Sequence, residues 1–141
     1  MHNFLVVLCI LHFVLCISSC SIPNLEKPEC TEARDGVKEF YSFHFGNDMK
    51  ESPENLKLRE KFLTPELYKT LSTSSEEKDY FTNSALPPKT FKIGKCEAPA
   101  GDRADIQVQL YWRDDNRTTQ KEVHVQAVKI GDAWLINKVT N

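Results

Sequence analysis

The chain has 141 residues, with 18 Lys or Arg against 20 Asp or Glu and a formal net charge of −2. This length suits a single globular domain. Because charges of both signs are interspersed and no basic stripe occurs, the composition argues against a nucleic-acid partner.

The first 19 residues have the pattern of a secretory signal peptide. Residues 4–17 are apolar except for His12, and no Asp, Glu, Lys or Arg occurs before Glu26. This run is too short for a bilayer-spanning helix, which needs about 20 residues, but it suits the apolar core of a signal. The usual basic start is missing, and only His2 stands in its place. We predict a signal peptide over residues 1–19.

The apolar run ends in Ile17-Ser18-Ser19-Cys20. This segment resembles the bacterial lipoprotein box, in which two small residues precede a cysteine that is lipidated and becomes the first mature residue. The resemblance implies a protein held to a membrane surface of the bacterial cell envelope by lipid on Cys20, on the periplasmic or outer-membrane side. One alternative is an ordinary signal cleaved near Ser18 or Ser19, which gives a secreted protein. The other is a buried N-terminal helix of a cytosolic protein.

The cysteine count bears on the same question. Of five cysteines, Cys9 and Cys16 leave with the signal, and lipid on Cys20 leaves two that can pair. Parity therefore favours a Cys30–Cys96 disulfide, which exported compartments permit. The alternative is that both are ordinary buried thiols.

Residues 20–29 contain two prolines and show no periodicity, which predicts an extended tether before a single domain over residues 30–141. Apolar positions spaced three and four apart predict a helix over residues 31–45, capped by Thr31 and stopped by a left-handed Gly46-Asn47. Ser52-Pro53 and Thr64-Pro65 predict two further helix starts. Ser74 with Glu77 matches a capping box, which predicts a short helix through Phe81.

The second half of the chain has the period of β-strands. Apolar residues alternate with polar ones over residues 90–96, 104–112 and 123–127, and again around Trp134 and Ile136. The RDDNRT segment and Gly131-Asp132 predict turns. Helices followed by an antiparallel meander indicate an α+β fold, with N-terminal helices packed on a sheet of about four strands.

This order of elements, together with three motifs, resembles the nuclear-transport-factor-2-like superfamily, also called cystatin-like or SnoaL-like. The motifs are GVKEFYSFHF, FLTPELYKTL and the closing VHVQAVKIGDAWLINKV. The second is similar to a segment of a bacterial family of unknown function often found on lipoproteins. The resemblance implies a curved sheet wrapped by helices around a conical pocket. Its enzymes use a pocket Asp or an Asp/His pair for proton transfer.

Candidate functional residues are few. His44, near the predicted helix end, is interpreted as structural, and His124, on a strand, as solvated. Asp79 is expected on a helix surface, Asp102 and Asp105 are interpreted as solvated, and no catalytic residue is assigned. No His, Cys and carboxylate spacing matches a metal site, and no cofactor motif occurs. Four aromatic residues are candidates for lining a pocket: Tyr41, Tyr68, Trp112 and Trp134.

Two functions follow from these patterns. The first is a lipid-anchored envelope protein whose non-catalytic domain binds a small apolar ligand or an envelope protein. The alternative is a pocket enzyme of the isomerase or dehydratase type. An inward-facing Asp or His in a cavity of several hundred Å³ favours the enzyme.

Overall fold

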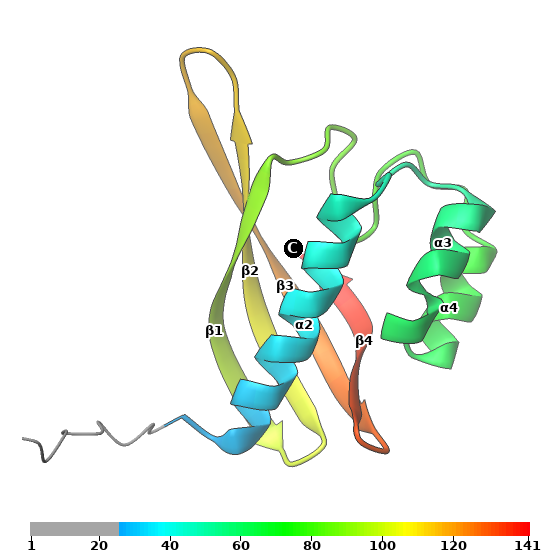
Figure 1. Cartoon of the computed structure of the whole chain (residues 1–141), viewed down its shortest axis with the longest axis vertical. Coiled ribbons are helices and arrows are strands. Elements are labelled where there is room, and N and C mark those ends of the chain that lie inside the picture. Colours follow the sequence, from blue (N-terminus) through cyan, green and yellow to red (C-terminus); the bar gives the residue numbers. More distant parts are fainter. Residues whose placement is uncertain (1–25) are drawn as a thin grey trace, which may run out of the picture.

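The computed structural model describes residues 26–141, so the predicted signal peptide, Cys20 and the first part of the tether lie outside the described residues. Within this described range, three α-helices and a 3₁₀ turn precede four strands (Figure 1). The elements are α2 (Pro28–Gly46), α3 (Pro53–Arg59), η1 (Glu60–Phe62), α4 (Pro65–Ser72), β1 (Thr90–Ala100), β2 (Arg103–Arg113), β3 (Thr118–Ile130) and β4 (Ala133–Thr140).

Helix α2 begins and ends differently from the sequence expectation. It starts at Pro28 rather than Thr31, because the fixed φ of proline and its missing N–H suit the first helical position. The last residues of the predicted tether are therefore helical. The predicted left-handed stop is also wrong, since Asn47 is extended, with φ −125° and ψ 172°. The Asn47 side chain instead donates to the Phe43 carbonyl at 2.7 Å.

The two Ser/Thr-Pro signals start helices as predicted. The Ser52 hydroxyl accepts a hydrogen bond from the Asn55 amide at 3.1 Å, and the Thr64 hydroxyl accepts one from the Leu67 amide at 3.2 Å. Each bond satisfies an amide that has no partner within its own helix. Helix α3 continues into η1, so the chain stays helical to Phe62.

The short helix predicted after Ser74 is wrong. Residues 73–89 form an irregular connection of turns and bends. Phe81 is buried in the core, and Tyr41 donates to its carbonyl at 2.7 Å. An isolated helix of this length is marginal, so these tertiary contacts override the capping-box pattern.

The four strands form an antiparallel meander in the order β1-β2-β3-β4. The strands extend beyond the apolar runs seen in the sequence, and β2 and β3 pair without interruption from Arg103↔Val128 to Arg113↔Thr118. Gly131 has φ +62° at the turn between β3 and β4, a conformation that glycine adopts without strain. The alternating residues of β2 and β3 bury one face of the sheet, as the period of two requires.

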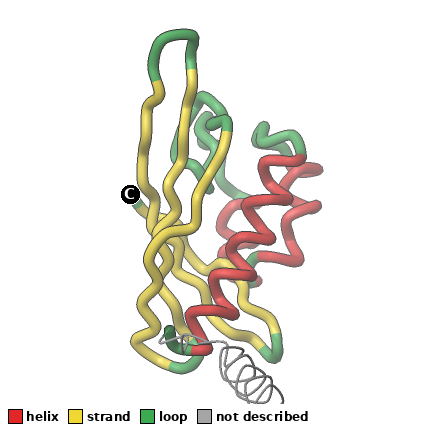
Figure 2. The backbone as a smooth tube through the Cα atoms, turned by 60° about the vertical axis from the view of Figure 1, so that its left-hand side comes forward, coloured by secondary structure: helices red, strands yellow, loops and turns green. Residues whose placement is uncertain are grey.

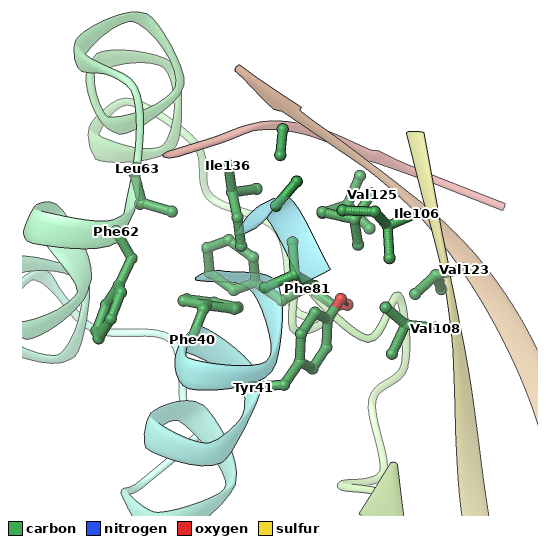
Figure 3. Packing of buried hydrophobic residues seen from close by; sticks show 14 of the residues in the cluster. Phe40, Tyr41, Phe62, Leu63, Phe81, Ile106, Val108, Val123, Val125 and Ile136 are labelled. Atoms are coloured by element: carbon green, nitrogen blue, oxygen red, sulfur yellow. Dashed lines mark hydrogen bonds between the residues drawn. The ribbon is translucent and has the colours of Figure 1, made fainter. Parts of the chain in front are cut away.

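The helices lie on one side of the sheet (Figure 2). Helix α2 contacts all four strands, and the connection after η1 joins the edge of β4 through Leu63 and Ile136. Phe40, Tyr41 and Phe81 pack against aliphatic side chains of the strands (Figure 3). The chain is therefore an α+β protein whose helix–sheet interface is filled by hydrophobic side chains.

Cys30 and Cys96 form a disulfide, in agreement with the parity of the cysteines. Their Cα atoms lie 5.8 Å apart across a separation of 66 residues. The bond links the start of α2 to the edge strand β1. It therefore fixes the N-terminal end of the helix against the sheet.

Candidate functional site

A buried network of three polar side chains joins the end of α2 to α3 and to the irregular connection. The Arg59 Nε–H donates to His44 Nδ1 at 2.7 Å, and His44 Nε2 lies 2.9 Å from Asp79 Oδ2. His44 and Arg59 are 1% and 3% exposed, respectively. The three residues come from α2, α3 and residues 73–89, so the network holds these segments together.

The network fixes the tautomer of His44. A guanidinium can only donate hydrogen bonds, so Nδ1 must be the unprotonated acceptor. Nε2 therefore carries the proton and donates it to the Asp79 carboxylate. Because both ring nitrogens are engaged, His44 has no free position from which to take a proton from a bound molecule.

Asp79 organises the connection in which it lies. The Thr82 hydroxyl donates to Asp79 Oδ2 at 2.6 Å, and the Phe81 amide donates to Oδ1 at 3.2 Å. These bonds close a tight turn beside the buried Phe81. A carboxylate with several donors is a stable hydrogen-bonded anion in a largely buried place.

Arg59 is a buried cation with neutral acceptors. Apart from His44, its Nη1 donates to the Asn55 carbonyl at 2.7 Å and its Nη2 to the Asp48 carbonyl at 2.8 Å. Burial lowers the pKa of the guanidinium, and the charges of Asp79 and Asp48 oppose that shift. Within residues 26–141 no carboxylate forms a direct ion pair with Arg59, and Asp79 lies one imidazole ring away.

A cavity of about 460 Å³ opens beside the network. Its walls come from the end of α2, the 47–52 segment, α3, α4 and the start of the irregular connection. Three residues of the network line it, together with the apolar side chains of Leu56 and Leu71. The volume is within the range of small-molecule sites. This cavity lies among the helices, away from the packed interface between α2 and the sheet.

Glu51 contributes a further carboxylate to the cavity. Partial burial raises the pKa of its carboxyl group above the ordinary value of 4.5, and the negative charges of Asp79 and Glu76 raise it further. The Tyr80 amide donates weakly to Glu51 Oε1 at 3.4 Å and opposes the shift. The 47–52 side of the cavity therefore holds the carboxylate of Glu51 as well as the ammonium group of Lys50.

This arrangement predicts that Glu51→Gln raises the melting temperature at pH 7. A raised folded-state pKa means that ionised Glu51 is disfavoured in the native structure, so removing the charge removes that cost. The gain should fade as the pH falls toward 4.5, where Glu51 becomes protonated. Thermal denaturation at several pH values measures it, with exposed Glu39→Gln as the control. A gain in melting temperature that is the same at every pH would show that the charge of Glu51 is not its cause.

Of the four aromatic residues predicted to line a pocket, one lies at the cavity and three lie elsewhere. Tyr68 lines the cavity. Tyr41 is fully buried in the core, and Trp112 donates to the Leu86 carbonyl at 2.8 Å. Trp134 donates to Glu32 at 3.1 Å on the other end of the sheet. These last three do not line this cavity.

The other candidates are placed as follows. His124 is exposed, with Glu122 at 3.3 Å, and Asp102 and Asp105 are exposed. Asp79 is not on a helix surface, which corrects the expectation, because the helix it was assigned to does not form. No group of three metal-ligating side chains occurs between residues 26 and 141.

Sequence reasoning missed the network, although part of its signal was present. His44 continues the three-and-four spacing of Val37, Phe40 and Tyr41, which predicts that it faces the core. Nothing in the local pattern pairs it with Arg59 or with Asp79, which is 35 residues away.

No family model matches the chain, and no curated protein matches its sequence. Among solved structures, the chain is similar to a protein of unknown function from Bacteroides thetaiotaomicron. The identity is 15%, the TM-score is 0.55, and the match covers 79% of this chain and 91% of that one. A de novo designed β-sheet protein matches at 16% identity and a TM-score of 0.36, over 79% of this chain and 85% of that one. The first likeness concerns the fold alone.

Within residues 26–141, no helix has the length and hydrophobicity needed to cross a membrane.

Proposed function

We propose that the chain is a lipid-anchored protein of the bacterial cell envelope whose α+β domain binds a small ligand in the cavity between α3, α4 and the end of α2. The domain is not a catalyst in this proposal. A signal peptide over residues 1–19 and lipid on Cys20 would place it at a membrane surface, and the Cys30–Cys96 disulfide is compatible with an oxidising compartment.

The observation that carries the proposal is a cavity of ligand size whose histidine and aspartate are already engaged by protein partners. Both nitrogens of His44 are engaged by Arg59 and Asp79, and Asp79 accepts from three donors. A general base needs a free acceptor within reach of the substrate proton. The site is therefore better suited to holding a molecule than to transferring its protons.

The enzyme alternative also has one observation in its favour. A histidine and an aspartate lie 2.9 Å apart at the wall of a 460 Å³ cavity, as in isomerases that transfer protons. It requires His44 to exchange its bond with Arg59 for one with a substrate.

We also propose that the domain has the cystatin-like cone and belongs to the nuclear-transport-factor-2-like superfamily. The order of helices and strands supports them.

Ligand binding is tested on protein purified from bacterial envelopes under native conditions. Native mass spectrometry should detect a bound small molecule that is released chemically unchanged. Leu71→Trp should abolish its retention, because the larger side chain fills the cavity. The matched control is Leu58→Trp on α3, since Leu58 is exposed and does not line the cavity. Retention that Leu71→Trp does not alter would contradict a ligand site here.

Anchoring gives a separate prediction. Cells expressing the full chain and grown with a fatty-acid analogue should incorporate the label into this protein, and Cys20→Ala should abolish incorporation because the lipid is attached through that sulfur. Detergent partitioning provides a second readout, in which the variant moves to the aqueous phase. Label that persists in Cys20→Ala rules the anchor out.

A further inference from the structure

Arg59 lines the cavity, and its contacts with the protein do not use all of its hydrogen-bond donors. Its guanidinium has five N–H groups. Three of them donate, to His44 and to the carbonyls of Asn55 and Asp48. The remaining two have no acceptor among the residues that the structure describes. A buried cation is ordinarily paired with an anion, and this one has only neutral acceptors in direct contact.

An anionic group in the cavity would complete this arrangement. Arg59 lines the cavity while remaining 3% exposed, so a ligand group that reached it would be largely shielded from water. A planar guanidinium matches the two oxygens of a carboxylate. A low-dielectric environment strengthens that contact relative to water.

The same side of the cavity also holds carboxylates. Glu51 lines the cavity, and its carboxylate accepts a hydrogen bond from the Tyr80 amide at 3.4 Å. Glu76 lines the cavity there as well. Partial burial and, to a smaller extent, the charges of Asp79 and Glu76 raise the pKa of Glu51, so a cationic ligand group beside this carboxylate is favoured.

Apolar side chains also line the cavity. Leu56 projects from α3, and Leu71 and Tyr68 project from α4. These side chains offer an apolar surface to the body of a ligand. The cavity thus combines charged groups of both signs with apolar side chains.

We infer that the cavity binds a small zwitterion with an apolar side chain, of the class of a free amino acid, with its carboxylate on Arg59, its ammonium toward Glu51 and its side chain against Leu56 and Leu71. This inference rests on the proposed function, because it names the ligand class of the same site.

The test uses a matched set of three molecules, measured against the purified chain by isothermal titration calorimetry. L-leucine carries both charges, 4-methylpentanoate lacks the ammonium, and 3-methylbutylamine lacks the carboxylate. Each charge-assisted hydrogen bond lost should weaken binding about tenfold or more. L-leucine is therefore expected to bind most tightly, and each analogue at least tenfold more weakly. If 3-methylbutylamine binds as tightly as L-leucine, Arg59 does not bind the carboxylate. If 4-methylpentanoate binds as tightly as L-leucine, Glu51 does not bind the ammonium.

Two variants locate the binding site. Glu51→Gln should weaken L-leucine binding about tenfold and should not weaken 4-methylpentanoate binding, because only the ammonium is placed beside Glu51. Exposed Glu39→Gln is the control and should change neither. Leu71→Trp should abolish binding of L-leucine, and circular dichroism verifies that the variant is folded. L-leucine affinity that is unaffected by Leu71→Trp overturns the assignment to this cavity.

Failure of this inference is distinguishable from failure of the proposed function. If none of the three molecules binds but native protein retains another small molecule that Leu71→Trp removes, the zwitterion is wrong and the binding domain stands. If none binds and no molecule is retained, both are wrong.

Discussion

Removing the disulfide is expected to lower the free energy of unfolding by about 4 kcal/mol. The bond closes a separation of 66 residues, and on the chain-entropy model such a cross-link restricts the unfolded ensemble strongly. Denaturant unfolding of the wild-type protein and of the Cys30→Ala/Cys96→Ala double variant measures the change. A domain of this size has a total stability of only about 5–15 kcal/mol, so the loss is a large fraction of it.

The single variants provide the control. Either Cys30→Ala or Cys96→Ala alone breaks the bond, so each should lose nearly as much stability as the double variant. The wild-type protein should also approach the variants when a reductant is present. Single losses that add up to the loss of the double variant, or a wild-type protein indifferent to the reductant, would show that the two sulfurs act independently.

Asp79→Ala is expected to lower the free energy of unfolding by about 3 kcal/mol. The substitution leaves the His44 Nε2–H, the Thr82 hydroxyl and the Phe81 amide without their acceptor, and it leaves Arg59 without the nearest negative charge in the network. Because Arg59 holds His44 Nδ1 as an acceptor, the ring cannot switch tautomer to compensate. Denaturant unfolding measures the loss.

Hydrogen exchange gives a local readout for the same variant. Amides of residues 73–89 should lose protection in Asp79→Ala, because this segment has few backbone bonds of its own and depends on Asp79. Asp105→Ala is the matched control, since Asp105 is exposed on β2 and surface substitutions usually change stability by less than about 0.5 kcal/mol. If the two variants lose the same amount, the network does not stabilise the fold.

Much of the fold was predictable because its signals are local. Alternation along Ala104, Ile106, Val108 and Leu110 defines which face of β2 is buried, since successive strand residues point to opposite faces. The Ser52-Pro53 and Thr64-Pro65 pairs start helices for a local reason. The hydroxyl accepts a hydrogen bond from an amide of the first turn, and the proline ring has the φ of the first helical position. The start of α2 at Pro28 is not evident from the sequence, because a proline suits both an extended tether and the first turn of a helix.

The candidate site was much less predictable. The segment after Ser74 has a helical start signal, yet Phe81 and Asp79 form contacts with α2 that a helix would not allow, and these contacts prevail. Tyr68 is an aromatic residue in a predicted helix, but no local pattern indicates the cavity that it lines. The partners of His44 come from positions 59 and 79, and no local spacing joins them.

The amino-acid sequence by itself determined the α+β class, the buried face of β2 and β3 and the two cysteines able to pair, because each depends on periodicity or on a count. Only the tertiary structure decided that Arg59, His44 and Asp79 meet beside a cavity. The physical reason is that a buried hydrogen bond depends on the relative placement of whole elements, which the packing of α2 on the sheet and of α3 beside it sets.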